Sequence, residues 1–488
     1  MKDWLKRITF GLTGLFLIIA LASCGSGSTP LSTPEADATA TSLPPAPSRV
    51  SAESLPKICN CVLRFDRISI EQGLSQSSVF VIFQDSRGFL WFGTEDGLNR
   101  YDGYAFKTFK PDPDVPTSLS DRWITSIVED QNGYLWIGTR QGGLNRFDPK
   151  SEQFQHFLYN SSDLLSLSNN HINSLLVDHD NNLWVGTTDG LDLFDPATGT
   201  FSHYVSKPAQ SDGISGKNVT AIYQDQLGRL WVGTSAGGLN QFDKQTKVFT
   251  SFQNNPANLN TISNNYVTAI TDAENGQLWV GTRNGLNRFD PESGLFEQFT
   301  HSEDNKQSLT NNTITSLQMD ITGNLWVGTL SGLDRLDTEV NRFIHYRNDP
   351  SFLQSLSKNH VTSIYEDRGG VLWFGTRGGG VNKYDRQRNN FAYYRHDPAN
   401  PNSLSGNSIF PIFVDSEGYA WIGTEVAGLN RFTWYTNLIM RFEHDPNDPN
   451  TIISNTIYSI AEDLDGLLWI GTADGLDSLN RDTFTFTH

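Results

Sequence analysis

Short apolar segments that alternate with polar residues recur from residue 62 to the end of the chain, separated by turns rich in Gly, Asn and Asp. The most regular of them is Leu-Trp-x-Gly-Thr, which occurs nine times, once with Ala420 in place of the leucine. Successive tryptophans are 45 to 48 residues apart and lie at Trp91, Trp136, Trp184, Trp231, Trp279, Trp326, Trp373, Trp421 and Trp469. A repeat of this length that consists of β-strands is typical of a propeller.

Each repeat contains four short segments with β-type alternation. In the second repeat they are Ile124–Glu129, Tyr134–Thr139, Gly143–Phe147 and Gln153–Phe157. The turns between them contain Gly, Asn, Asp or Pro, and none is long enough to include a crossover helix. The pattern therefore predicts an all-β fold, a β-propeller built from nine four-stranded antiparallel repeats.

An aspartate precedes the tryptophan by six residues in eight of the nine repeats, and Ala273 stands there in the fifth. The aspartates are Asp85, Asp130, Asp178, Asp225, Asp320, Asp367, Asp415 and Asp463. A ring of calcium loops would need an Asp-x-Asp-x-Asp-Gly pattern with a later Glu, which none of the repeats contains. We therefore interpret the aspartates as caps of the first hairpin and the tryptophans as wedges between neighbouring repeats.

Composition narrows the classes of function. With 37% hydrophobic and 18% charged residues, the chain is able to bury a substantial core. Its formal net charge of -18 repels phosphate backbones, so we expect no binding to nucleic acid. The sequence contains no nucleophile elbow, no HExxH and no Walker loop. We accordingly expect no cofactor, no bound metal and no catalytic residues.

The amino-terminal segment predicts export. Residues 1–23 combine a basic start, a short apolar run and small residues before Cys24, which is the arrangement of a lipoprotein signal peptide. Cleavage would leave Cys24 as the lipidated first residue, followed by a Ser/Thr/Pro-rich linker over residues 24–61. The alternative is an uncleaved membrane anchor, for which the apolar run is short. Either way we expect a membrane-anchored protein on the extracytoplasmic side, at the cell surface or in the periplasm. Cys59 and Cys61 have no role that the sequence indicates.

The repeat resembles the two-component regulator propeller repeat, whose signature Asp-x-x-Gly-x-Leu-Trp-x-Gly-Thr-x-x-Gly-Leu is matched at Asp130–Leu144. Phe65–Ser69 and Gly97–Tyr104 are similar to the first blade of that family's sensor ectodomains in hybrid two-component systems. The resemblance implies that the chain passes extracytoplasmic signals, often glycans, to a histidine kinase and a response regulator. The sequence has no kinase-type nucleotide loop and no apolar run after residue 24 that is long enough to span a membrane. We therefore expect a lipoprotein without its own kinase that acts through a separate histidine kinase or another membrane protein.

Two arrangements of the nine repeats are open. Leu63–Ser69 has the pattern of a fourth strand without its first three, which predicts that it completes the last blade of a ring. The first arrangement is a seven-bladed propeller over residues 62–390, with residues 391–488 forming two further blades of an incomplete second ring that Phe391–Tyr394 opens. The alternative is one nine-bladed ring, which the uniform spacing of the repeats favours.

Candidate ligand-binding positions lie in two sets of loops that share one end of a propeller. Thirteen residues before each tryptophan stand Ser78, Trp123, His171, Asn218, Tyr266, Thr313, His360, Ser408 and Thr456. Four residues after it stand Glu95, Arg140, Thr188, Ser235, Arg283, Leu330, Arg377, Glu425 and Ala473. We expect Trp123 and Tyr266 to stack on a sugar ring, and the arginines and carboxylates to bond its hydroxyl or acidic groups.

Three functions are compatible with these positions. The first is an extracytoplasmic sensor that binds an oligosaccharide through Trp123, His171, Tyr266, His360, Arg140, Arg283, Arg377, Glu95 and Glu425. The second is a scaffold that binds other proteins. The third is a propeller lyase or hydrolase, for which His171 and His360 are the two histidines at the shared end. Other histidines, His203 and His345 among them, fall on outer strands without an evident partner.

Overall fold

The computed structural model describes residues 63–206, 213–337, 341–386, 394–398, 400, 402–433 and 438–488. The expected signal peptide, Cys24, the linker, Cys59, Cys61 and residues 391–393 lie outside the described residues. Among the residues that are described, no helix has the length and apolar character needed to cross a membrane.

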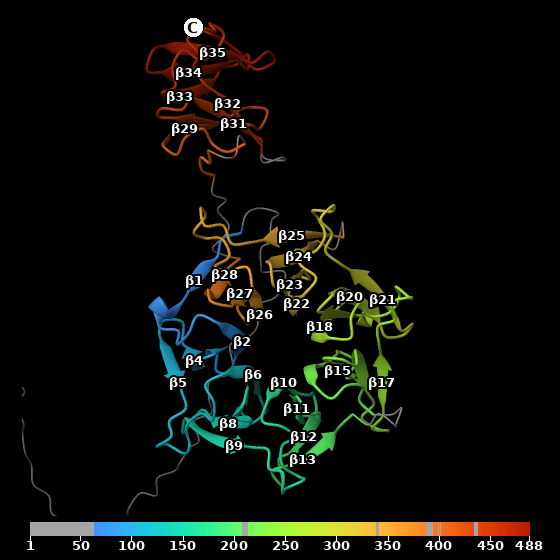
Figure 1. Ribbon diagram of the computed structural model, residues 1–488. Helices are drawn as coiled ribbons and strands as arrows, with labels where there is room; N and C mark the ends of the chain where they lie inside the picture. The colour runs from blue at the N-terminus through green and yellow to red at the C-terminus, as the bar shows by residue number, and fades with distance from the viewer. Residues whose placement is uncertain are drawn as a thin grey trace, which may run out of the picture. The chain divides into compact units, whose positions relative to one another are not determined.

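The described chain consists of nine four-stranded antiparallel sheets, here called blades and numbered by their tryptophans (Figure 1). Blade 1 consists of β2 (Val79–Gln84), β3 (Leu90–Thr94), β4 (Gly97–Tyr101) and β5 (Phe106–Phe109), and blade 2 of β6 (Ile124–Glu129), β7 (Leu135–Thr139), β8 (Leu144–Asp148) and β9 (Gln153–Phe157). Blade 3 consists of β10 (Ile172–Val177), β11 (Leu183–Thr187), β12 (Leu191–Asp195) and β13 (Thr200–Tyr204). Blade 4 consists of β14 (Val219–Gln224), β15 (Leu230–Thr234), β16 (Leu239–Phe242) and β17 (Phe249–Phe252).

Blade 5 consists of β18 (Val267–Asp272), β19 (Leu278–Thr282), β20 (Gly285–Asp290) and β21 (Leu295–Phe299). Blade 6 consists of β22 (Ile314–Met319), β23 (Leu325–Thr329), β24 (Leu333–Asp337) and β25 (Arg342–Tyr346). Blade 7 consists of β26 (Val361–Glu366), β27 (Leu372–Thr376) and β28 (Gly380–Tyr384) together with β1 (Asp66–Ile68). Blades 8 and 9 are β29 (Ile409–Val414), β30 (Ala420–Thr424), β31 (Leu429–Thr433) and β32 (Leu438–Phe442), and β33 (Ile457–Glu462), β34 (Leu468–Thr472), β35 (Leu476–Asn480) and β36 (Thr485–Thr487). Two short 3-10 helices, η2 (Ile70–Gln72) and η3 (Glu274–Gly276), complete the described elements. The all-β prediction with nine four-stranded repeats is confirmed.

The strand that precedes blade 1 completes blade 7. Residues Asp66, Arg67 and Ile68 of β1 pair with Lys383, Asn382 and Val381 of β28. This is the pairing expected of the unattached fourth strand at Leu63–Ser69. The first strands of the seven blades contact one another in the cyclic order β2, β6, β10, β14, β18, β22, β26 and back to β2, and Figure 1 shows them around a common centre. In the last two blades, β29 contacts β33.

A repeated hydrogen bond joins neighbouring blades. The donor is the backbone N–H of the residue after the repeated aspartate, and the acceptor is the side chain seven residues before the tryptophan of the next blade. His179 N thus donates to Gln224 Oε1 at 2.7 Å, and Ile321 N donates to Glu366 Oε2 at 2.8 Å. Arg368 of blade 7 makes the same bond with Gln84 Oε1 of blade 1, at 2.9 Å. The contact that joins blade 7 to blade 1 is therefore built like those between consecutive blades.

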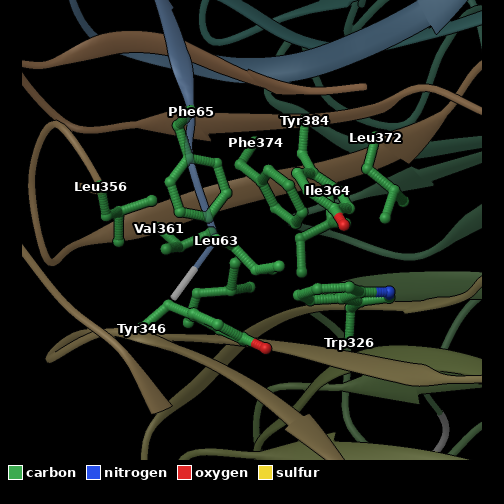
Figure 2. Packing of buried hydrophobic residues seen from close by; sticks show 11 residues of the cluster. Leu63, Phe65, Trp326, Tyr346, Leu356, Val361, Ile364, Leu372, Phe374 and Tyr384 are labelled. Carbon is green, nitrogen blue, oxygen red and sulfur yellow. The ribbon is translucent and has the colours of Figure 1, made fainter. Parts of the chain in front are cut away.

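The core lies between the blades. Each apolar cluster combines the tryptophan of one blade with the inner and outer strands of the next. In Figure 2, Leu63 and Phe65 from the segment before β1 fill the space between Trp326 and Tyr346 of blade 6 and Phe374 of blade 7. The Phe65 ring meets that of Phe374 edge-on, with centroids 5.7 Å apart. Burial of such aromatic side chains contributes about 2 to 3 kcal/mol each, so the first described residues stabilise the last blade of the seven.

The glycine of Leu-Trp-x-Gly-Thr allows this close packing. A Cβ atom on Gly93 would lie 2.6 Å from Cγ2 of Ile124, the first residue of the next blade's inner strand. No side chain fits at that distance, and the same approach recurs between Gly281 and Ile314. The repeated glycine is thus a condition for stacking one blade on the next.

The aspartate six residues before each tryptophan has two structural functions. In blade 7, Asp367 Oδ1 accepts the backbone N–H groups of Gly369 and Val371 at 2.9 and 3.0 Å, which closes the first hairpin. Its Oδ2 accepts the indole N–H of Trp373 at 2.8 Å. The indole bond is present in all eight blades that have the aspartate, at 2.7 to 3.0 Å. The interpretation as hairpin caps is confirmed, and the bond to the tryptophan is an addition that the sequence reading missed.

Blade 9 differs from the others in the exposure of its tryptophan. Trp469 is 38% exposed, whereas the other eight tryptophans of the repeat are at most 4% exposed. The neighbouring Leu476 on β35 is also exposed. One face of blade 9 therefore has no blade packed on it among the described residues.

Two outer-strand histidines have partners that the sequence did not indicate. Nδ1 of His203 lies 2.7 Å from Oδ1 of the buried Asp192, and Nε2 lies 3.0 Å from the Leu164 carbonyl. His345 makes the same pair of contacts with Asp334 and the Lys306 carbonyl. The bond to the carboxylate raises the pKa of both histidines, while their burial opposes the shift. The expectation that these histidines lack partners is wrong, because the outer strand places them directly opposite an aspartate of the third strand.

Replacing Asp367 by Ala is expected to destabilise the protein by about 2 kcal/mol, because two backbone N–H groups and one buried indole N–H lose their acceptor. The measurement is the thermal midpoint of the purified chain. Asp367→Asn is the matched control and should lose about half as much, since its single oxygen still accepts from the hairpin. Equal midpoints for the wild type and Asp367→Ala would contradict this function of the aspartate.

The His–Asp pairs predict a pH dependence of stability. Because the pKa of His203 and His345 is higher in the folded than in the unfolded chain, their stabilising effect is complete below the unperturbed pKa of about 6.5 and is lost as pH rises through the raised values. Thermal midpoints of the wild type and of the double variant His203→Gln, His345→Gln should therefore differ most near pH 5.5 and converge toward pH 8.5. A difference that grows with pH would refute the assignment.

Candidate functional site

The two predicted sets of loop positions lie beside each other at one end of each blade. The backbone N–H of Arg140 donates to the Trp123 carbonyl at 3.0 Å, that of Arg283 to the Tyr266 carbonyl at 3.1 Å, and that of Arg377 to the His360 carbonyl at 3.0 Å. The same bond is present at Thr188, Ser235, Glu425 and Ala473. We call the surface formed by these paired positions in blades 1 to 7 the loop face.

Trp123 and Arg140 form a stacked pair in blade 2. The guanidinium carbon of Arg140 lies 4.0 Å from the centre of the Trp123 ring, a cation–π distance. The ring of Phe80, in blade 1, lies 5.5 Å away at an angle of 32°. The half-buried indole is therefore covered by the arginine, and a ligand in this place meets the guanidinium as well as the aromatic ring.

Tyr266 and Arg283 repeat this arrangement in blade 5. The guanidinium carbon lies 3.7 Å from the centre of the tyrosine ring. Thr313 of blade 6 donates its hydroxyl to the Arg283 carbonyl at 3.3 Å, which ties this loop to the next blade. An aromatic ring that holds one side of a guanidinium leaves its N–H edge free for an anion.

The two histidines of the loop face are in blades 3 and 7, and each has an arginine as a neighbour. Burial lowers the pKa of His171, and the charge of Arg140 lowers it further. Burial and the charge of Arg377 have the same effect on His360. Both rings are therefore neutral at pH 7 and are able to accept a hydrogen bond. No group of three or more His, Cys, Asp or Glu side chains that would hold a metal occurs among the described residues.

The two glutamates are bonded within their own blades. Glu95 accepts from Gln76 Nε2 at 3.4 Å in blade 1, and Glu425 accepts from the Ser408 hydroxyl at 2.7 Å in blade 8.

The structure joins other predicted residues in pairs: Trp123 with Arg140, Tyr266 with Arg283, and His360 with Arg377. Through Arg140, the first pair also reaches His171 electrostatically.

A further set of residues, which the sequence reading missed, fixes these loops. Asn169 and Asn264 accept the backbone N–H two residues later, at His171 and Tyr266, at 2.7 and 2.8 Å. Asp121 does the same for Trp123 and also accepts from Gln141 N at 2.8 Å, which joins the two loops of blade 2. The signal was present in the sequence as an Asn or Asp two residues before the variable position.

The arginines of the loop face have no acidic partner. Within the described ranges, no carboxylate forms an ion pair with Arg140, Arg283 or Arg377, although the protein has 54 acidic residues. Lys217, in the loop before the first strand of blade 4, is by contrast paired with Asp189 at 2.6 Å. Three uncompensated guanidinium groups on one surface are suited to an anionic ligand.

The two component regulator propeller family matches the chain nine times, at residues 73–96, 118–141, 166–189, 213–236, 261–284, 308–331, 355–378, 403–426 and 451–474. Each match covers the first hairpin of one blade and the loop positions on either side of it. This chain belongs to the two component regulator propeller family. The repeats of this family therefore account for every blade of the described structure.

The chain is similar to solved structures of bacterial extracellular domains. The extracellular domain of the hybrid two component system BT3049 of B. thetaiotaomicron has 28% sequence identity and a TM-score of 0.73 over 87% of this chain. The extracellular domain of BT4673 from the same organism, at 23% identity and a TM-score of 0.55, shares the fold. The chain spans 54% of the length of each of these domains. It thus resembles the extracellular domains of two-component systems.

A curated relative shares a short part of the sequence. "Histidine kinase P4" of Formosa agariphila is 56% identical over 48 residues, which are 10% of this chain and 4% of the kinase. A match of that length corresponds to one propeller repeat.

The arginine–histidine neighbours predict a selective change in titration. Arg140→Gln is expected to raise the pKa of His171, because a positive charge beside the ring is removed, and to leave His360 unchanged. Arg377→Gln should raise the pKa of His360 alone. NMR titration of the histidine Cε1–H resonances measures both. Equal shifts of both histidines in either variant would show that these neighbours do not act locally.

Proposed function

We propose that this protein is an extracytoplasmic sensor that binds an acidic oligosaccharide on its loop face. The observation that carries the proposal is the set of three arginines, Arg140, Arg283 and Arg377, that have no ion-pair partner among the described residues of a chain with net charge -18. Elsewhere on such an acidic surface a polyanion is repelled. The guanidinium groups of Arg140, Arg283 and Arg377, on the loop face of blades 2, 5 and 7, would reverse that preference on this surface.

The side chains beside these arginines favour an acidic glycan over other anionic ligands. Trp123 and Tyr266 supply aromatic surface beside the guanidinium groups, which suits the apolar faces of sugar rings. His171 and His360 are neutral at pH 7 and are able to bond hydroxyl groups. Uronate or sulfate groups on such a glycan would take the N–H edges of the arginines. We propose that the protein acts by binding this ligand, without turnover.

The route of the signal follows from the family. The chain resembles extracellular domains of two-component systems, so we propose that ligand binding is passed to a histidine kinase. The lipobox-like sequence before Cys24 supports a lipid anchor that holds the propeller at the outer side of a membrane. Metabolic labelling with an alkyne fatty acid tests the anchor, since Cys24→Ser should abolish the label.

Binding of an acidic glycan is tested by calorimetry with an oligogalacturonate and with a neutral oligosaccharide of equal length. We expect the acidic ligand to bind, and Arg140→Gln, Arg283→Gln and Arg377→Gln each to weaken it about tenfold or more, the effect of one charge-assisted hydrogen bond.

Arg288→Gln is the matched control, because Arg288 lies in the same blade as Arg283 but pairs with Glu297 on the outer strand. It should leave the affinity unchanged. Equal binding of the neutral oligosaccharide, or equal loss in the control, would overturn the proposal.

A further inference from the structure

A repeated hydrogen bond joins the first strands of consecutive blades at the interface between them, here called a seam and named by its two blade numbers. The second residue of one first strand donates from its side chain to the backbone carbonyl of the first residue of the next. In the described chain the bond runs from Asn173 to Val219 at 2.8 Å, from Thr220 to Val267 and from Thr315 to Val361 at 2.6 Å, and from Thr362 to Val79. Seams 3–4, 4–5, 6–7 and 7–1 are tied in this way.

Two threonines at the same position do not make this bond. Oγ1 of Thr125 at seam 2–3 and Oγ1 of Thr268 at seam 5–6 are buried and have no hydrogen-bond partner within the part of the chain that the structure describes. Thr268 Oγ1 lies at its seam, because a Cβ atom on Gly281 would be 3.3 Å from it and 2.6 Å from Cγ2 of Ile314. A buried hydroxyl group without a partner is costly, so each of these groups would gain from an acceptor.

The first residue of the following blade distinguishes the two kinds of seam. It is a valine wherever the bond is present, and it is Ile172 or Ile314 where the threonine is unpaired. Isoleucine is larger than valine by one methylene group, and a closely packed interior accommodates such a group only by a shift of its surroundings. We interpret the isoleucines as holding the first strands of seams 2–3 and 5–6 too far apart for the bond.

The opposite ends of these two seams also depart from the repeat. The position that accepts the backbone N–H of the preceding blade is Val177 at seam 2–3 and Met319 at seam 5–6, and neither side chain contains an oxygen. At seam 2–3 the N–H of Gln131 bonds Asn181 Oδ1 instead, at 3.0 Å. Both seams therefore lack the two polar contacts that most of the other blades repeat.

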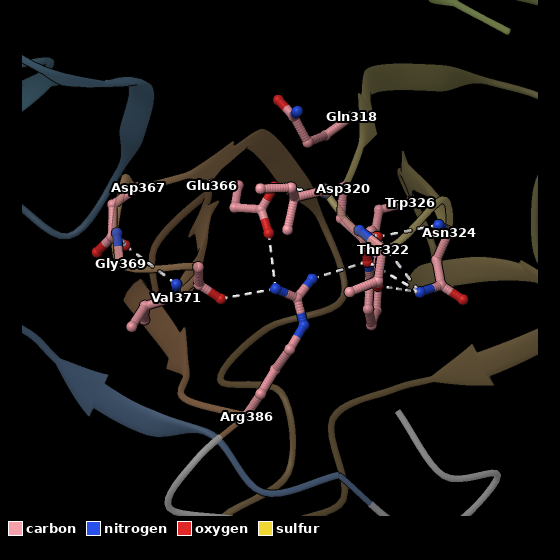
Figure 3. A network of polar contacts seen from close by, with 12 residues as sticks. Gln318, Asp320, Thr322, Asn324, Trp326, Glu366, Asp367, Gly369, Val371 and Arg386 are labelled. Atoms are coloured by element: carbon pink, nitrogen blue, oxygen red, sulfur yellow. Dashed lines mark hydrogen bonds and ion pairs between the residues drawn. The ribbon is translucent and has the colours of Figure 1, made fainter. Parts of the chain in front are cut away.

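Seam 6–7 is the opposite case, because it has both repeated bonds and an ion-pair network in addition. Figure 3 shows Arg386 between Glu366 of blade 7 and Asp320 of blade 6, at 2.6 and 2.9 Å. Such a buried network fixes two blades in one arrangement. Seams 2–3 and 5–6 are held by apolar packing to a greater extent, which allows a change in their spacing.

The stacked pairs of the loop face lie in the blades that contain the unpaired threonines. In blades 2 and 5 the aromatic residue of the pair comes two positions before the threonine. Burial and the charge of Arg140 lower the pKa of His171, so Arg140 and this residue of blade 3 are neighbours across seam 2–3. Across seam 5–6, Thr313 of blade 6 donates its hydroxyl to the Arg283 carbonyl at 3.3 Å. A ligand on either pair therefore meets groups from two blades.

We propose that Thr125 and Thr268 are positioning residues of the loop face, whose hydroxyl groups bond the carbonyls of Ile172 and Ile314 when a ligand draws the two blades of each seam together. A ligand that contacts both blades binds the closer arrangement more tightly and thus shifts the seam toward the bonded form. The bond adds to the affinity although neither buried hydroxyl touches the ligand. The place of the ligand is that of the proposed function, on which this assignment rests.

The experiment compares Thr125→Val and Thr268→Val with the control variants Thr220→Val and Thr315→Val in the full chain. The first two should keep the wild-type thermal midpoint, because they lose no bond. Each should weaken an oligogalacturonate about fivefold in calorimetry, the effect of one neutral hydrogen bond. The two controls should lower the midpoint and leave the affinity unchanged, because their bond is present with and without ligand.

Two results would overturn the assignment. One is an unchanged affinity in Thr125→Val and Thr268→Val. The other is a fall of their thermal midpoint as large as that of the controls. Absence of oligogalacturonate binding by the wild type would instead refute the proposed function, and a ligand-free measurement would then decide between a bonded and an unbonded seam.

That measurement is a double-mutant cycle at seam 2–3. Ile172→Val removes one methylene group and should allow Thr125 to make its bond. Thr125→Val should therefore lower the thermal midpoint in the Ile172→Val background, although it does not in the wild type. The matched control is Ile124→Val at seam 1–2, where the donor position holds Phe80 and Thr125→Val should have no added effect. Additive effects of Thr125→Val and Ile172→Val would contradict the assignment.

Discussion

The packing of one tryptophan per blade against the next blade is the interaction on which the rest of the structure depends. An indole side chain has a large apolar surface and one N–H group, and burial without an acceptor for that group is costly. Eight blades solve this with an aspartate that accepts the indole N–H and also closes the first hairpin, as Asp367 does for Trp373. One carboxylate thus couples the local turn to the wedge between blades.

This coupling explains where the structure departs from its own repeat. Blade 5 has Ala273 instead of the aspartate, and there the hairpin changes to a 3-10 turn beside a cavity. In blades 1 to 7 each first strand contacts the first strands of both neighbouring blades. Blade 7 accepts β1 at its outer edge and is joined to blade 1 by the hydrogen bond from Arg368 N to Gln84 Oε1. The segment at Leu63 and Phe65 then fills the core between blades 6 and 7.

The sequence predicted which loop positions form the candidate site, but it did not predict which of their side chains touch. Trp123, Arg140, Tyr266 and Arg283 stand at positions whose residue type changes from repeat to repeat while the rest of the repeat is constant. The backbone hydrogen bonds between the paired loops confirm that the two sets of positions are adjacent. That the arginines lie over the aromatic rings depends on side-chain rotamers, which spacing does not encode. The lowered pKa of His171 likewise depends on its burial beside Arg140 of the preceding blade.

The sequence by itself determined the fold class, the number of blades, the hairpin turns and the presence of a strand before blade 1 that completes the last blade of a ring, because these depend on local alternation and on a motif repeated at constant spacing. Which blade this strand completes was decided by the tertiary structure, in which β1 pairs with β28 of blade 7. Only the tertiary structure decided which side chains of different blades meet. Arg386 with Asp320, His203 with Asp192, and the cavity beside Ala273 arise from the register and the stacking of whole sheets. Such contacts join residues whose distance along the chain carries no information about their separation in space.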